Sequence, residues 1–124
     1  MKVIILCGGK GSRLAEETKL IPKPMVRVGK IPIVVHIIRH FRYYGFKEII
    51  LATGYKNEII KNYFKNNRKF SNISTIYTGK NSLTGGRLLR LKNLIKKDSN
   101  ENFFLTYGDG LINVNLKRLL KFHY

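Results

Sequence analysis

Cysteine, acidic residues and long apolar runs are all scarce in this 124-residue sequence. The single cysteine, Cys7, rules out an internal disulfide framework and is typical of a reducing, cytoplasmic compartment. No apolar run approaches the roughly 18 residues that a membrane helix requires, so we expect no membrane partner. The first residues form a strand pattern that runs into a glycine loop, which is unlike a secretory signal peptide.

The sequence has only 7 Asp and Glu residues against 24 Lys and Arg residues, for a formal net charge of +17. This balance invites a nucleic-acid partner. However, there is no zinc-ligand set, no aromatic RNA-binding signature and no arginine-rich arm, and many lysines stand at helical spacing, as on solvated faces. We therefore expect weak, salt-sensitive attraction to nucleic acid and no specific binding.

Strand and helix patterns alternate along the chain. Apolar runs predict strands at 2–7, 48–53, 72–78 and 102–107. Apolar residues at helical spacing predict helices at 32–44, from residue 57, at 87–95 and at 115–123. This order predicts one α/β domain over residues 1–124 with no linker, built on a Rossmann-like, doubly wound, mostly parallel sheet.

The last predicted strand is strongly apolar, and the helix pattern after it has no terminal glycine. A parallel sheet that ends on a bare apolar strand is prone to association. We therefore expect the chain to be the first half of a larger domain. The alternative is a short natural domain whose last helix closes the sheet.

A glycine-rich turn follows the first predicted strand, in the segment Leu6-Cys7-Gly8-Gly9-Lys10-Gly11-Ser12-Arg13-Leu14. Glycines let backbone N–H groups approach an anion, and an arginine side chain suits phosphate. The segment lacks the Gly-x-x-x-x-Gly-Lys-Ser/Thr spacing of a P-loop. It also lacks the third glycine of a dinucleotide fingerprint, because Leu14 stands at that position. The turn predicts a phosphate cradle, with a plain strand-to-helix turn as the alternative.

Asp109 lies between two glycines at the end of the last predicted strand, whereas Asp98, the other aspartate, lies in a polar turn. Ligands of doubly wound sheets bind beyond the carboxyl ends of the strands. A carboxylate there, near a phosphate loop, is suited to Mg²⁺. The alternative is a turn aspartate that caps local backbone.

Two further cations stand in restricted contexts. Lys23 lies between Pro22 and Pro24, as a charge clamp on a nucleotide or as a solvent lysine in a proline bend. Arg87 follows Thr84-Gly85-Gly86 at the expected start of the helix 87–95, where it either reaches phosphate or sugar or is an exposed helix arginine. Cys7 is expected to fill a packed strand end.

The three histidines lie within helix patterns and have no metal-ligand spacing. We expect His36, His40 and His123 to be surface or core residues.

Taken together, the motifs resemble those of the sugar-1-phosphate nucleotidyltransferases, and within them the glucose-1-phosphate cytidylyltransferase branch. The shared segments, in family order, are Gly8-Gly9-Lys10-Gly11-Ser12-Arg13-Leu14, Glu16-Glu17-Thr18, Pro22-Lys23-Pro24-Met25-Val26, Tyr44-Gly45-Phe46, Gly54-Tyr55-Lys56, Thr84-Gly85-Gly86-Arg87-Leu88 and Thr106-Tyr107-Gly108-Asp109-Gly110.

The resemblance implies that CTP and glucose 1-phosphate give CDP-glucose and pyrophosphate in a Mg²⁺-dependent reaction. Arg13 would act on the triphosphate, Lys23 on the α-phosphate and Asp109 as the Mg²⁺ ligand. The implied nucleotide-binding residues are Leu6, Cys7, Gly8, Gly9, Lys10, Gly11, Ser12, Arg13, Lys23, Ser82, Arg87 and Gly108. Full-length members are expected to form homo-oligomers.

The sequence also departs from the family pattern. Family members are roughly twice as long, and their later half carries a second metal-binding aspartate and most of the sugar pocket. The stretch between Phe64 and Thr78 is shorter than in the cytidylyl branch, and Arg27, Ile31 and Val35 replace other common residue types. Another base or acceptor, such as phosphocholine, and a non-catalytic nucleotide-binding remnant therefore stay open.

Overall fold

A computed structural model describes residues 1–11, 20–96 and 102–124 of the chain. Its centre is a four-stranded sheet in the order β5-β4-β1-β6. The strand bounds are Val3–Cys7 for β1, Ile49–Thr53 for β4, Ile73–Tyr77 for β5 and Phe104–Tyr107 for β6. All three pairings are parallel. The four predicted strands and their parallel arrangement are confirmed.

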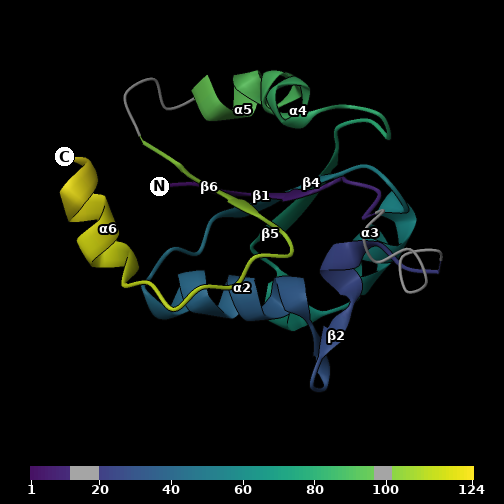
Figure 1. Ribbon diagram of the computed structural model, residues 1–124, viewed down its shortest axis with the longest axis horizontal. Coiled ribbons are helices and arrows are strands. Elements are labelled where there is room, and N and C mark those ends of the chain that lie inside the picture. The colour runs from purple at the N-terminus through teal and green to yellow at the C-terminus, as the bar shows by residue number, and fades with distance from the viewer. Residues whose placement is uncertain (12–19, 97–101) are drawn as a thin grey trace.

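Helices cover both faces of this sheet, as Figure 1 shows: α4 and α5 lie above it and α2 lies below it. The helix bounds are Ile33–Tyr43 for α2, Asn57–Lys65 for α3, Thr84–Arg90 for α4, Lys92–Lys96 for α5 and Leu116–His123 for α6. The predicted doubly wound α/β fold is therefore confirmed.

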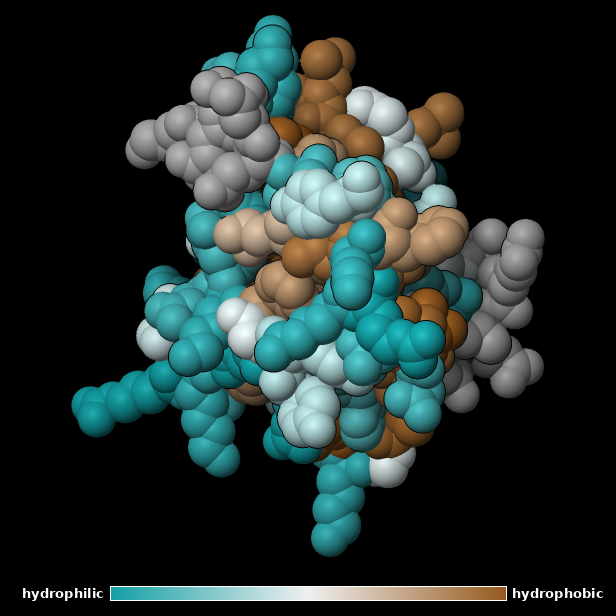
Figure 2. All heavy atoms as spheres, turned by 90° about the vertical axis from the view of Figure 1, so that its left-hand side faces the viewer, coloured by the Kyte–Doolittle hydropathy of each residue, from teal (hydrophilic) through white to brown (hydrophobic). Residues whose placement is uncertain are grey.

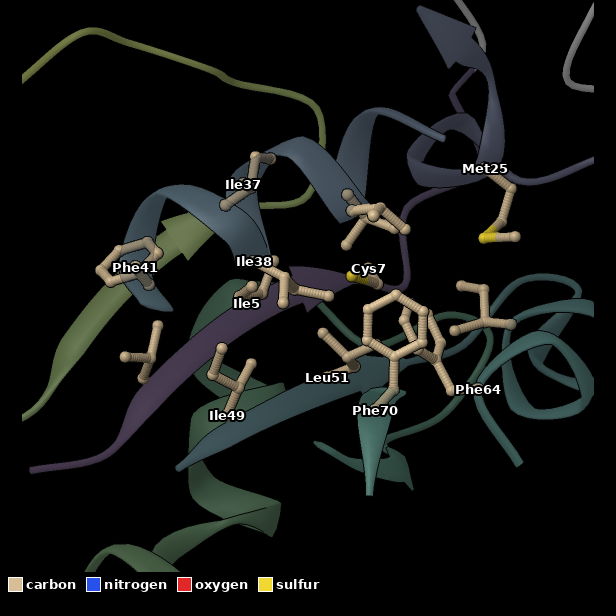
Figure 3. Packing of buried hydrophobic residues seen from close by; sticks show 14 of the residues in the cluster. Ile5, Cys7, Met25, Ile37, Ile38, Phe41, Ile49, Leu51, Phe64 and Phe70 are labelled. Carbon is tan, nitrogen blue, oxygen red and sulfur yellow. The ribbon is translucent and has the colours of Figure 1, made fainter. Parts of the chain in front are cut away.

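The two central strands have their side chains buried on both faces. Successive side chains point to opposite faces of a strand, so Ile5 and Leu51 pack toward α2, where Ile38 is fully buried. Figure 3 shows this layer. Ile4 and Ile50 pack instead against Leu91, between α4 and α5. Burial on both faces explains why β1 and β4 are continuous apolar runs rather than alternating ones.

One predicted helix differs from the structure. The helix expected at 87–95 begins three residues earlier and is divided at Leu91 into α4 and α5. Gly85 and Gly86 therefore lie inside the first turn of α4 rather than ahead of it. The Arg87 N–H donates to the Leu83 carbonyl at 2.9 Å, which closes that turn despite the low helix propensity of glycine.

Several short elements were not predicted because each is too short for a periodic signal. They are the 3₁₀ turns η2 (Lys23–Met25) and η3 (Arg68–Phe70), and the antiparallel pair β2 (Arg27–Val28) and β3 (Ile31–Pro32). The η2 turn is placed at the carboxyl end of the sheet, where it carries Lys23.

Strand β6 forms one edge of the described sheet. Phe104 packs edge-on against Phe41 of α2, whereas Leu105 and Tyr107 on the opposite face are 43% and 60% exposed. Figure 2 views the left-hand side of Figure 1, where the N-terminus and α6 lie, and shows brown apolar side chains among teal polar ones. No helix in the described part of the chain is long and apolar enough to cross a membrane.

Candidate functional site

A cleft of about 400 Å³ opens at the carboxyl ends of β1 and β6, beside the start of α4. This is the position at which doubly wound sheets bind their ligands. The cleft is lined by Leu6, Cys7, Gly8, Gly9, Gly11, Lys23, Pro24, Ser82, Leu83, Thr84, Arg87, Tyr107 and Asp109.

The cleft brings together most of the residues expected from the sequence. Of the expected set, Leu6, Cys7, Gly8, Gly9, Gly11, Lys23, Ser82, Arg87 and Asp109 line it. Lys10 is exposed outside the lining, and buried Gly108 lies behind it. Ser12 and Arg13 lie outside the described residues, so the role expected for Arg13 stays a prediction.

Four lining residues were not expected: Pro24, Leu83, Thr84 and Tyr107. Pro24, Thr84 and Tyr107 belong to the shared motifs, so their position beside Lys23, Arg87 and Asp109 was the available signal. Leu83 has no such signal. It is 82% exposed.

Arg87 lies inside the protein, with its guanidinium beneath the cleft. Its side chain is 5% exposed, so the alternative of an exposed helix arginine is wrong. Nη1 donates to the Gly79 carbonyl at 2.7 Å, to Thr78 Oγ1 at 3.0 Å and to the Thr53 carbonyl at 3.3 Å. Nη2 donates to the Gly8 carbonyl at 2.8 Å. One side chain thereby joins the segments at the ends of β1, β4 and β5.

The Arg87 side chain also explains two glycines. A Cβ on Gly8 would overlap the guanidinium, and a Cβ on Gly54 would lie 2.5 Å from the Gly79 carbonyl oxygen and 2.6 Å from Arg87 Nη1.

Burial lowers the pKa of Arg87 from its usual value, but an arginine side chain keeps its proton in proteins. A positive charge therefore lies beneath the cleft.

Lys23 and Asp109 form an ion pair at the opposite side of the cleft, with 2.7 Å between Lys23 Nζ and Asp109 Oδ2. The Lys23 backbone is restricted by the flanking prolines and by the η2 turn, in which the Met25 N–H donates to the Pro22 carbonyl at 2.9 Å. The lysine is thus held against a carboxylate rather than free in solvent.

Gly108 lets the Asp109 segment approach the η2 turn. A Cβ on Gly108 would lie 2.8 Å from Cys7 Sγ and 3.0 Å from Pro24 Cγ. Its main-chain N–H also donates to the Leu6 carbonyl at 2.9 Å. A glycine is therefore required beside Asp109 for packing, and the segment is held against the end of β1.

Cys7 is 1% exposed and packs at the end of β1, as expected. Burial raises the pKa of its thiol, and the Asp109 charge raises it further. The thiolate is the nucleophilic form, so a thiol kept neutral in this way suits packing and not nucleophilic attack.

The histidines also lie apart from the cleft. His36 and His40 contact the Val28 and Val114 carbonyls at 2.8 and 2.9 Å, and His123 contacts Asn102 Oδ1 at 3.3 Å. Within residues 1–11, 20–96 and 102–124, no three His, Cys, Asp or Glu side chains are grouped to hold a metal ion.

The donor set of the cleft nevertheless fits Mg²⁺ bound together with a nucleotide. Mg²⁺ in phosphate-transfer sites is held by one or two carboxylates, by substrate phosphates and by water. Asp109 is the carboxylate that lines the described cleft, next to the glycine loop. The site thus suits a metal that arrives with phosphates, and not a metal held by protein ligands alone.

Comparisons with known proteins agree with this geometry. A family model described as "Nucleotidyl transferase" matches residues 2–124. The chain is 43% identical to the probable glucose-1-phosphate cytidylyltransferase of Bacillus subtilis, over 99% of this chain and 56% of that protein. It is 40% identical to the D-glycero-alpha-D-manno-heptose 1-phosphate guanylyltransferase of Campylobacter jejuni, over 96% of this chain and 52% of that protein.

A solved structure shows the same fold. The crystal structure of HddC from Yersinia pseudotuberculosis complexed with GMP-PN superposes with a TM-score of 0.75 at 31% identity, over 97% of this chain and 52% of that one. The chain thus spans about half the length of the relatives it matches. The motifs, the fold and these matches together show that the chain belongs to the sugar-1-phosphate nucleotidyltransferases of the nucleotidyl transferase family.

Proposed function

We propose that this chain binds CTP with Mg²⁺ and provides the nucleotide side of a reaction that forms CDP-glucose and pyrophosphate from CTP and glucose 1-phosphate. The observation that carries the proposal is the Lys23–Asp109 pair beside the glycine loop, in a cleft lined by residues of the family motifs. The 43% identity to the probable glucose-1-phosphate cytidylyltransferase of Bacillus subtilis supports the cytidylyl assignment. We place the reaction in the cytoplasm.

The chain's residues would act mainly by positioning and charge neutralisation. The backbone around Gly8, Gly9 and Gly11 would accommodate the phosphates, with Ser82 as a further nucleotide contact from the α4 side and Arg13 on the triphosphate. Lys23 would move from Asp109 to the α-phosphate as the nucleotide binds. Asp109 would hold Mg²⁺, which supplies charge neutralisation and orientation of the reacting groups.

The transfer itself is an in-line displacement at phosphorus. A phosphate oxygen of the sugar phosphate forms a bond to the α-phosphorus. The bond from that phosphorus to the bridging oxygen breaks, and pyrophosphate leaves with the electron pair. Lys23 would stabilise the negative charge that spreads over the α-phosphate oxygens.

Choice of base is the finer part of the proposal. The guanylyltransferase relative is nearly as similar as the cytidylyl one. The cytidylyl alignment extends over 144 positions, more than the 124 residues of this chain, so that relative carries residues that this chain lacks. The guanylyl alignment extends over 121 positions. The stretch between Phe64 and Thr78, which is shorter here than in the cytidylyl branch, is in keeping with this difference in length. GTP is therefore the comparison nucleotide for the binding experiments.

A second candidate function is nucleotide binding without transfer. It is favoured by one observation: Asp109 is the sole carboxylate in the lining of the described cleft. The two candidates predict the same binding and differ in turnover.

The binding step is tested with Asp109→Asn. We expect wild-type protein to bind CTP more tightly with Mg²⁺ than with EDTA. Loss of one charged ligand should remove most of this difference, about tenfold or more in affinity. Isothermal titration with CTP and GTP, each with and without Mg²⁺, measures it.

Glu48→Gln is the matched control, because Glu48 pairs with Lys2 at the opposite end of the strands, with 3.8 Å between the charged atoms. It should bind as wild type does. If Asp109→Asn keeps the full Mg²⁺ effect, the metal role of Asp109 is excluded. Tighter binding of GTP than of CTP would reassign the base.

Lys23→Met is expected to remove the ammonium of the ion pair and to leave the Asp109 carboxylate in place. Without the ammonium, the Asp109 carboxylate is open to a divalent cation, so Mn²⁺ should bind the nucleotide-free variant more tightly than wild type. CTP affinity should fall, because a phosphate partner is lost. Water-proton relaxation reports Mn²⁺ binding, with Lys2→Met as the control lysine. Unchanged Mn²⁺ affinity would show that the pair does not shield Asp109.

The 124-residue chain alone should release little or no pyrophosphate from CTP, glucose 1-phosphate and Mg²⁺. One carboxylate does not fix Mg²⁺ in the two-carboxylate geometry implied by the family resemblance. A coupled pyrophosphate assay measures this, with the Bacillus subtilis relative assayed alongside. Turnover comparable to that relative would overturn the expectation and rule out binding without transfer.

A further inference from the structure

Arg87 has a geometry that differs from that of a phosphate ligand. Its Nη1 is shared among three protein oxygens and its Nη2 donates to the Gly8 carbonyl. A ligand-binding arginine directs its fork of donors at the anion. Here the described bonds of the fork are directed at the protein, and only 5% of the residue is exposed.

The Gly8 carbonyl is held from two sides. It accepts from Arg87 Nη2 at 2.8 Å and from the Tyr55 N–H at 3.2 Å, which occupies both of its lone pairs. A trans peptide is planar, with the carbonyl and the following N–H pointing in opposite directions. The bond to Arg87 therefore directs the N–H of Gly9 away from the guanidinium, and Gly9 itself is exposed.

We propose that Arg87 is a positioning residue that sets the orientation of the Gly8–Gly9 peptide, so that the loop presents an N–H, and not a carbonyl, to the bound phosphates. This inference rests on the proposed function. A carbonyl turned toward the cleft would place partial negative charge against the phosphates, whereas an N–H attracts them. Arg87 then acts on the nucleotide through Gly8.

The fork shape of arginine is essential to this role. The Gly8 and Gly79 carbonyls belong to different segments, and two nitrogens of one planar group reach both. A lysine ammonium is a single point charge on a flexible stem. Arg87→Lys is therefore expected to keep the charge and lose the orientation.

The structure offers a double-variant test. The three nearest atoms to a Cβ built on Gly8 all belong to the Arg87 guanidinium, so Gly8→Ala opposes that side chain. At Gly54 the obstacle includes backbone, the Gly79 and Gly8 carbonyl oxygens at 2.5 and 2.9 Å. Removal of the Arg87 side chain takes away the three nearest obstacles at Gly8 and leaves the two backbone obstacles at Gly54, which makes Gly54→Ala the matched control.

The first measurement is the amide resonance of Gly9 in nucleotide-free, ¹⁵N-labelled protein. We expect it to move in Arg87→Ala, Arg87→Lys and Gly8→Ala, while most other resonances are retained. Guanidinium ion at low millimolar concentration should return it toward wild type in Arg87→Ala, and methylammonium should not. A residue that is only a phosphate ligand leaves the nucleotide-free Gly9 resonance in place, and that result overturns the proposal.

The second measurement is CTP affinity. Loss of the bond that orients the Gly8–Gly9 peptide should weaken CTP binding about tenfold in Arg87→Ala, and Gly8→Ala added to it should cost no more. Gly54→Ala added to Arg87→Ala should cost more. If the losses of CTP affinity in Arg87→Ala and Gly8→Ala add up in the double variant, the proposal is overturned.

If wild-type protein binds no CTP, the proposed function fails, and the Gly9 resonance still decides the role of Arg87. Arg87→Lys provides both readouts if Arg87→Ala does not fold.

Discussion

A single buried guanidinium holds the candidate site together. Burial of an arginine is unfavourable unless its N–H groups are satisfied, and Arg87 meets this condition through the Gly8, Thr53 and Gly79 carbonyls and the Thr78 hydroxyl. These four acceptors lie at or just beyond the carboxyl ends of three different strands. Fixing them together defines the shape of one wall of the cleft, and it dictates that Gly8 has no side chain.

The opposite wall depends on a second ionic contact, of a different kind. Arg87 is bonded to uncharged oxygens and keeps a positive charge under the cleft, whereas Lys23 is neutralised by Asp109 at 2.7 Å. Both partners of that pair stay partly exposed, so water and ligands reach them. The buried contact therefore shapes the site, and the exposed contact can exchange partners. Phosphate is the natural competitor for the lysine and a divalent cation for the carboxylate.

The sheet, its parallel order and the location of the site were predictable, because each rests on a local pattern. Continuous apolar runs predicted β1 and β4, and the carboxyl-end rule placed the glycine loop near Asp109. The role of Arg87 was not predictable in this way. A charged residue in a helix pattern is expected on the solvated face, and the four oxygens that draw Arg87 inward come from residues 8, 53, 78 and 79. Likewise, Lys23 and Asp109 were candidates individually, but only the folded η2 turn and Gly108 bring them into contact.

The arrangement separates nucleotide binding from transfer in physical terms. The described groups suited to a metal-bound nucleotide (the glycine loop and Lys23 for phosphate, Asp109 for a divalent cation) gather at the ends of strands that Arg87 and the sheet already hold in register. Binding needs only that these groups are pre-positioned, since their attraction to phosphate or to the cation is electrostatic and local. Transfer also requires an acceptor held in line with the α-phosphorus, which is a matter of geometry across the whole cleft. The contacts that shape the nucleotide side therefore do not by themselves fix the acceptor, and the proposed nucleotide binding depends on less of the cleft than transfer does.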